Sequence, residues 1–128
     1  ACHKIDHELT SRFGVTHGAG LAVLTPAWMR YVWRENPKRF LDFAHRIMQE
    51  EEQPNARAAT IEAAVSSLET FYSRIGLPHK LSKYGVEASA IPEMARLATH
   101  APDGSDRPLG GLKKIYEADA VAIYEKAL

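Results

Sequence analysis

The sequence contains a single cysteine, Cys2, among its 128 residues. One cysteine excludes an internal disulfide and fits a reducing, cytoplasmic compartment. The sequence also has no excess of either charge, because sixteen Lys and Arg balance sixteen Asp and Glu, giving a formal net charge of zero. Proteins that bind nucleic acids or membrane surfaces usually carry a basic excess, so we expect neither kind of partner.

Long apolar runs and several well-known motifs are also missing. The longest uncharged stretch, 14–29, is interrupted by Thr, His, Gly and Pro and is too short to cross a bilayer. No segment alternates apolar and polar residues between turn signals, as a strand would. There is no P-loop, nucleophile elbow or GxGxxG, and the zinc-protease motif HExxH fails because Ser11 stands where its second histidine is needed.

What the sequence does contain is helical periodicity. Its length fits one domain that buries roughly two-thirds of its unfolded surface. Apolar residues recur at helical spacing in six segments, 1–13, 18–35, 37–49, 56–75, 90–100 and 117–127. Loops separate them, and one loop, 101–111, is rich in Pro, Gly and Asp. We therefore predict an all-α bundle of about six helices over residues 1–128.

Particular residues are expected to begin and end these helices. Gly14 and Gly76 should end the first and fourth helices in the left-handed conformation. Pro37 should occupy the first turn of the third helix, and Asn55 and Ser89 should cap the fourth and fifth. Core positions of the third and fourth helices are predicted from their spacing as Phe40, Phe43, Ala44, Ile47, Ile61, Ala64, Val65, Leu68, Phe71, Tyr72 and Ile75.

Three of the six histidines, His3, His7 and His17, lie close together at the start of the chain. His3 and His7 are four residues apart, so a helix places both imidazoles on one face. His17 follows a helix break at Gly14 and opens the next helix, whose positive end favours the neutral, metal-binding imidazole. Because imidazole is the commonest side-chain ligand of Zn, Fe, Ni and Cu, this segment is a candidate metal site. Two exposed histidines on a frayed first helix are the alternative.

The other candidates for a functional role are weaker. His45, His79 and His100 fall near helix ends, loops or the edge of the core, where surface placement is the default. Cys2 adjoins His3, but consecutive helical residues point about 100° apart, which makes it a poor additional ligand. Small residues at Gly18 and Gly20 would allow another backbone or a ligand to come close.

The order of these motifs resembles the iron-containing alcohol dehydrogenase family, and its butanol-dehydrogenase-type branch most of all. The most specific are HxxxHELT (3–10), THGAGLA (16–22) and PAWMRYV (26–32). The similarity continues through NPKRF (36–40), GLPHKL (76–81), IPEMA (91–95), RPLGG (107–111) and DAVAIY (119–124) and so covers nearly the whole chain. Tyr116 departs from the Ser or Thr that the family often has before its last helix, so a shifted helix start is expected.

The resemblance implies a fold and a chemistry for the whole enzyme. In that family an N-terminal α/β domain binds NAD or NADP, and a C-terminal all-α domain closes over it. A divalent metal, usually Fe²⁺ although Zn²⁺ or Ni²⁺ can occupy such sites, assists hydride transfer between alcohols and aldehydes as a Lewis acid. By matching positions, His3 and His17 correspond to two metal ligands. His7 corresponds to a histidine facing the nicotinamide and substrate, with a catalytic and cofactor-binding role, and Gly18 lies toward the cofactor.

The start of the chain leads to a further expectation. It begins with Ala rather than Met, and its candidate site lies at its very N-terminus. We therefore expect the C-terminal domain alone, inactive by itself, whose partners are the missing N-terminal domain, a small alcohol or aldehyde and, as the family often forms dimers, a second copy. The alternatives are a stand-alone helical metal-binding or interaction module, and a helical domain without a site.

Overall fold

The computed structural model describes residues 1–51 and 55–128. Within these ranges the only β-structure consists of two isolated bridges, so the predicted all-α class is confirmed. The short 3₁₀ segments are η1 (Trp33–Glu35), η2 (Leu81–Tyr84) and η3 (Ala88–Ala90). The α-helices are α1 (Cys2–Phe13), α2 (His17–Val32), α3 (Pro37–Arg46), α4 (Arg57–Arg74), α5 (Ile91–Thr99) and α6 (Glu117–Ala127). No helix among the described residues is long and apolar enough to cross a membrane.

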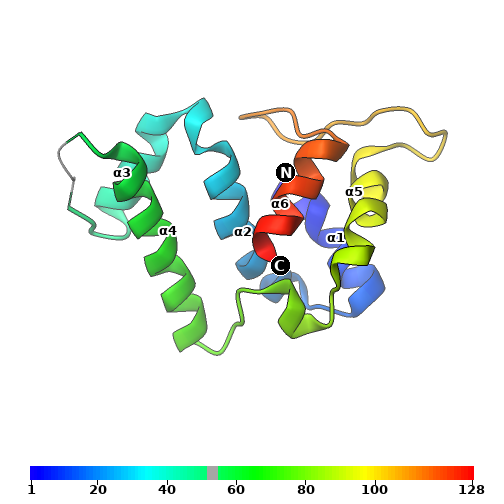
Figure 1. Ribbon diagram of the computed structural model, residues 1–128, viewed down its shortest axis with the longest axis horizontal. Coiled ribbons are helices and arrows are strands. Elements are labelled where there is room, and N and C mark those ends of the chain that lie inside the picture. Colours follow the sequence, from blue (N-terminus) through cyan, green and yellow to red (C-terminus); the bar gives the residue numbers. More distant parts are fainter. Residues whose placement is uncertain (52–54) are drawn as a thin grey trace.

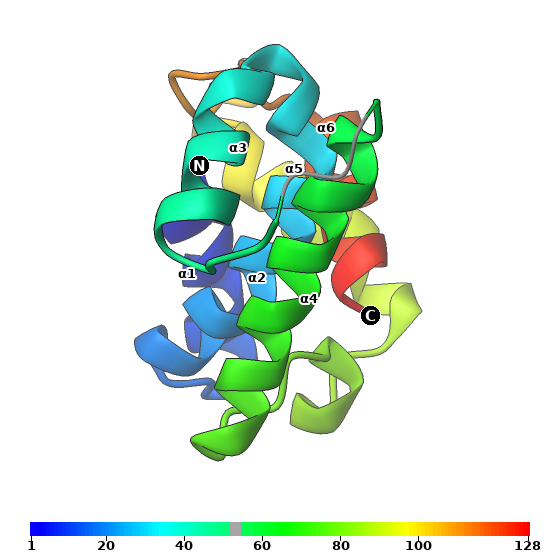
Figure 2. The ribbon, with the colours of Figure 1, turned by 90° about the vertical axis from the view of Figure 1, so that its left-hand side faces the viewer.

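Helix α2 lies at the centre of the bundle. It packs against α1, α4 and α6, and Figure 1 shows α3 and α4 to one side of it with α1, α5 and α6 to the other. Figure 2, in which the side of α3 and α4 faces the viewer, shows α4 running in front of α2. Nine of the sixteen residues of α2 are buried, because its sequence is apolar almost all round. The elements that meet α2 are therefore placed by a common core.

Helix α1 is held in that core from one side. Ile5 and Leu9 are completely buried, and Gly14 ends the helix at φ 65°, as predicted. From α6, the hydroxyl of Tyr124 donates a 2.7 Å hydrogen bond to the carbonyl oxygen of Ile5. Burial raises the pKa of the Tyr124 phenol, so this hydroxyl keeps its proton over the ordinary pH range. The opposite face of α1, which carries His3 and His7, remains exposed.

Helices α3 and α4 follow most of the predicted signals. Pro37 lies in the first turn of α3, and the Asn36 side chain accepts a hydrogen bond from the backbone N–H of Arg39. Arg30 ties α2 to α4 through hydrogen bonds to Glu62 at 2.8 Å and to Glu69 at 2.5 Å. After α4, Gly76 takes a φ of 82°, as expected for the residue that terminates a helix.

Two of the predicted caps are wrong. Asn55 has a φ of 59° and belongs to the turn before α4, whose N-cap is Ala56. Ser89 lies inside η3, so α5 begins later, at Ile91. In both places a local turn occupies the residue that would otherwise cap the helix, a competition that periodicity alone does not show. Residues 52–54 of the predicted polar break lie outside the described residues.

Three residues that were predicted to lie in the core are exposed. Ile47, Phe71 and Ile75 are 67%, 51% and 55% exposed, because α3 ends at Arg46 and the last turns of α4 extend past the packed core. The expected shift of the last helix is also wrong. The side chain of Asp119 accepts a 2.9 Å hydrogen bond from the backbone N–H of Tyr116, so α6 begins at Glu117 without a Ser or Thr cap.

Candidate metal centre

The imidazole of His17 lies at the surface and contacts a buried carboxylate. His17 is the first residue of α2, reached from Gly14 through a short turn in which Thr16 is extended. Its Nδ1 is in hydrogen-bond contact with Oδ2 of Asp6, from α1. The side chain of His17 is 52% exposed whereas that of Asp6 is completely buried. One nitrogen of the imidazole is therefore fixed from the interior while the ring remains open to the surface.

His3 lies next to this imidazole. The ring centroids of His3 and His17 are 5.2 Å apart, and the ring planes are tilted by 53°. The two side chains come from different helices, and both are exposed. The turn after Gly14 thus brings together the two residues that the family resemblance matched to metal ligands.

His7 lies in the same region, next to His17. With Thr10, Ser11 and His17 it lines an open hollow of about 520 Å³ on the surface of the helix pair α1 and α2. The other two histidines of the N-terminal cluster, His3 and His7, therefore both lie near His17. Among residues 1–51 and 55–128, no group of three or more His, Cys, Asp or Glu is arranged to hold a metal ion. The described residues accordingly offer His3 and His17 as a pair of candidate ligands, with His7 near His17.

The two glycines of α2 differ sharply in what surrounds them. At Gly18 an added Cβ would meet no described atom within 4 Å, so this exposed end of the helix is open. At Gly20, which is buried, an added Cβ would lie 1.6 Å from Oδ1 of Asp6. The group that comes close to Gly20 in the described structure is therefore the Asp6 side chain, from the neighbouring helix α1.

Sequence reasoning missed Asp6. It falls on the buried stripe of α1 with Ile5 and Leu9, at the spacing of three and four residues that marks one helix face. A carboxylate inside an apolar stripe is unusual, because burying it is costly unless it is paired. That position in the pattern was the available signal.

The other candidate ligands are engaged or shielded. Burial raises the pKa of the Cys2 thiol to about 11, so it stays protonated at neutral pH. His45 contacts the carbonyl oxygen of Glu50 at 2.8 Å, and His79 contacts the hydroxyl of Ser73 at 3.1 Å. None of these three residues belongs to the histidine cluster.

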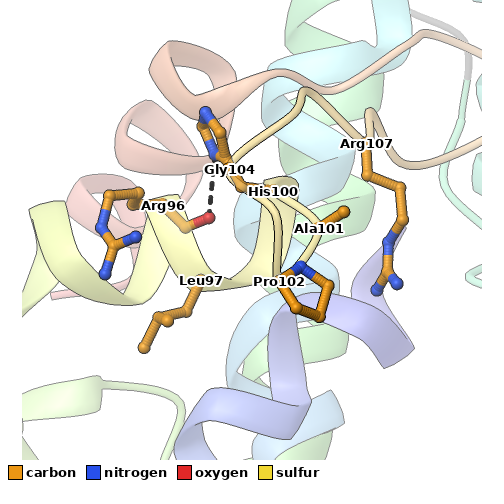
Figure 3. A pocket seen from close by; sticks show the side chains of 7 residues that line it. All are labelled: Arg96, Leu97, His100, Ala101, Pro102, Gly104 and Arg107. Atoms are coloured by element: carbon orange, nitrogen blue, oxygen red, sulfur yellow. Dashed lines mark hydrogen bonds between the residues drawn. The ribbon is translucent and has the colours of Figure 1, made fainter.

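A second hollow, of about 440 Å³, lies beside the end of α5 (Figure 3). Both ring nitrogens of His100, on the edge of this hollow, have partners. Nε2 lies 3.2 Å from the carboxylate of Asp106 and Nδ1 lies 3.0 Å from the carbonyl oxygen of Arg96. The guanidinium groups of Arg96 and Arg107 lie on opposite sides of the hollow in Figure 3. Its charged groups do not converge on a common point, in contrast to the histidine cluster.

The family model described as the Fe-containing alcohol dehydrogenase family, C-terminal, matches residues 1–128 of this chain. The chain belongs to this family. Among curated relatives, it is 30% identical to NADH-dependent butanol dehydrogenase A of Clostridium acetobutylicum over 128 residues, which are 99% of this chain and 32% of that protein. It is 32% identical to the NADPH-dependent aldehyde reductase YqhD of Escherichia coli, over 92% of this chain and 31% of that protein.

Solved structures of the Fe-containing alcohol dehydrogenase family share the helical arrangement. NADH-dependent butanol dehydrogenase A of Thermotoga maritima superposes with a TM-score of 0.85 at 29% identity, covering 98% of this chain and 32% of that one. The chain thus spans about a third of the length of the relatives that it matches.

The residues present fit the metal for which the Fe-containing family is named. Two imidazoles from different helices lie side by side at the surface, and imidazole suits iron and zinc. The contact between His17 and Asp6 is the carboxylate–histidine arrangement that commonly supports a metal ligand. In addition, Oδ1 of Asp6 is buried without a hydrogen-bond partner among the described residues, so a cation nearby would offset an uncompensated charge.

Proposed function

We propose that this chain is the metal-holding, all-α part of an NAD(P)-linked alcohol dehydrogenase that interconverts alcohols and aldehydes. The observation that carries the proposal is the pairing of His3 with His17, with Asp6 behind the pair and His7 beside it. Membership of the Fe-containing alcohol dehydrogenase family and likeness to butanol dehydrogenases and an aldehyde reductase support this chemistry.

In this proposal His3 and His17 bind Fe²⁺, with Zn²⁺ or Ni²⁺ as substitutes, through imidazole nitrogens. When bound, the metal supplies Lewis-acid polarisation of the substrate oxygen. His7 lines the hollow next to His17, where its imidazole can hold or pass on a proton at that oxygen or order the nicotinamide. Gly18 leaves the start of α2 open to the cofactor, since an added Cβ there would meet no neighbouring element of the described structure within 4 Å.

The proposal also assigns the chain a place in a larger protein. Two histidines hold a metal weakly compared with the four ligands in fixed geometry typical of tight sites. The relatives are about three times as long as the matched segment, which leaves room for a preceding domain. We propose that such a domain supplies the remaining ligands and most of the nucleotide site, and that this chain is the C-terminal domain.

A turnover assay tests the function directly. The natural-length protein, meaning the product of the complete reading frame, is stripped of metal and assayed with NADH or NADPH and butanal, before and after Fe²⁺ is added. We expect oxidation of the reduced cofactor only with metal. The 128-residue chain, assayed in parallel, is expected to show none.

Three outcomes would contradict this account. Equal turnover by the stripped and the reconstituted natural-length protein would exclude the metal-dependent reaction. Turnover by the 128 residues alone would exclude the need for a second domain. A reading frame without any nucleotide-binding part, together with metal binding, would favour a stand-alone metal-binding module instead.

A further inference from the structure

We propose that Asp6 is the positioning residue of His17, and that Gly20 is glycine because it makes room for the Asp6 carboxylate. This inference rests on the proposed function, since it concerns how His17 presents itself to the metal. Three features of the described structure carry it, namely the contact between Asp6 and His17, the burial of Asp6 and the space at Gly20.

The contact fixes which nitrogen of His17 is free. Nδ1 of His17 faces Oδ2 of Asp6, so this ring nitrogen is engaged by the carboxyl group, whose oxygen can accept the Nδ1–H hydrogen bond. In the neutral imidazole the lone pair is then on Nε2. Metal-ligating histidines usually have such an outer partner, which fixes the tautomer and the orientation of the ring. Asp6 therefore selects Nε2 of His17 as the nitrogen that binds metal.

The burial of Asp6 argues that it has a role beyond packing. Its side chain is completely inaccessible, and Oδ1 has no hydrogen-bond partner among the described residues. An incompletely paired buried carboxylate destabilises a fold relative to an apolar residue of similar size. Neighbouring positions on the same stripe, Ile5 and Leu9, are apolar and fully buried. Packing alone would favour an apolar residue at position 6, so the contact with His17 accounts for the carboxylate.

Gly20 provides the space that this carboxylate needs. An added Cβ would lie 1.6 Å from Oδ1 and 2.9 Å from Cγ of Asp6, so both cannot keep their places. The Asp6 side chain is short and enclosed, and moving it away would break its contact with His17. A substitution at Gly20 should therefore act on the metal ligand through Asp6, whose side-chain atoms are the nearest to an added Cβ.

The test measures the affinity and the visible absorption spectrum of Co²⁺ bound to the natural-length protein. We expect Asp6→Ala to weaken Co²⁺ binding by about 10- to 100-fold, the range typical of losing an outer-shell partner. Asp6→Asn has nearly the same shape and keeps an oxygen that accepts the Nδ1–H, so it should retain more affinity. This rescue by the conservative variant, with a shifted ligand-field spectrum in Asp6→Ala, is not expected of a merely structural residue.

A matched pair of glycine variants adds an independent arm. Gly20→Ala should weaken Co²⁺ binding in the same direction as Asp6→Ala, because the new methyl group displaces the carboxylate. Gly18→Ala makes the same chemical change two residues earlier in α2, where no described atom lies within 4 Å of the added Cβ. We expect Gly18→Ala to leave the Co²⁺ affinity, measured without nicotinamide cofactor, unchanged. Circular dichroism of each variant reports whether the helices remain folded.

His17→Ala separates failure of this inference from failure of the proposed function. Equal Co²⁺ binding by the parent protein and His17→Ala would show that the proposed metal site itself is wrong. Loss of Co²⁺ in His17→Ala, together with unchanged affinity and spectrum in folded Asp6→Ala and Gly20→Ala, would overturn the positioning role alone. Weaker binding in Asp6→Ala and Gly20→Ala, with partial rescue in Asp6→Asn, is the result expected.

Discussion

His17→Ala in the natural-length protein is expected to remove the bound metal and to lower turnover by at least about a thousandfold. A factor of a thousand is about 4 kcal/mol of transition-state free energy, within the several kcal/mol that a Lewis-acid metal supplies. His7→Ala is expected to behave differently, keeping the metal while turnover falls by about 10²- to 10⁴-fold, the range for a lost proton-transfer group. Elemental analysis and steady-state kinetics of the same preparations measure both quantities.

His79→Ala serves as the control for these variants. His79 follows α4 and contacts Ser73 of that helix. It is not part of the histidine cluster, so its replacement should change neither metal content nor turnover. Full metal content in His17→Ala would rule out its role as a ligand. Loss of metal in His7→Ala would show that the roles of the histidines on α1 are assigned wrongly.

Leu9→Ala is expected to lower the free energy of unfolding of this chain by about 2–5 kcal/mol, the range for a buried leucine truncated to alanine. Leu9 is completely buried, and with Ile5 it anchors α1, which carries His3 and His7. Loosening α1 should therefore also weaken metal binding. Urea unfolding followed by circular dichroism measures the stability change.

Leu97→Ala is the matched control for the core prediction. Leu97 is 40% exposed on α5, so the same truncation removes less buried surface and should lower the free energy of unfolding by less than about 1 kcal/mol. Equal losses for the two variants would contradict the packing of α1 described above.

The helices could be predicted from the sequence because their signals are local. The apolar stripe and Gly14 define α1, and the almost wholly apolar α2 could be recognised as a central helix. The predicted caps at Asn55 and Ser89 were wrong because each of these residues belongs to a local turn and not to the helix N-cap. The predicted burial of Phe71 and Ile75 was wrong for another reason. Periodicity identifies a helix face but not how far along the helix that face is covered.

The candidate site was only partly predictable. The spacing of the histidines and a family resemblance singled out His3, His7 and His17, and their metal and catalytic roles remain predictions. Asp6 was missed because its partners, His17 and Gly20, lie on another helix and meet it only through the crossing of α1 and α2. A charged residue within an otherwise apolar stripe is the sequence feature that should prompt a search for such a partner.

The most direct test of the central claim is a crystal structure of the natural-length protein loaded with Zn²⁺, with data collected on both sides of the zinc absorption edge. We predict one anomalous peak at bonding distance, about 2.0–2.1 Å, from a ring nitrogen of His3 and from Nε2 of His17. His7 should lie near the peak without bonding to it. A zinc site that includes neither His3 nor His17 would contradict the account.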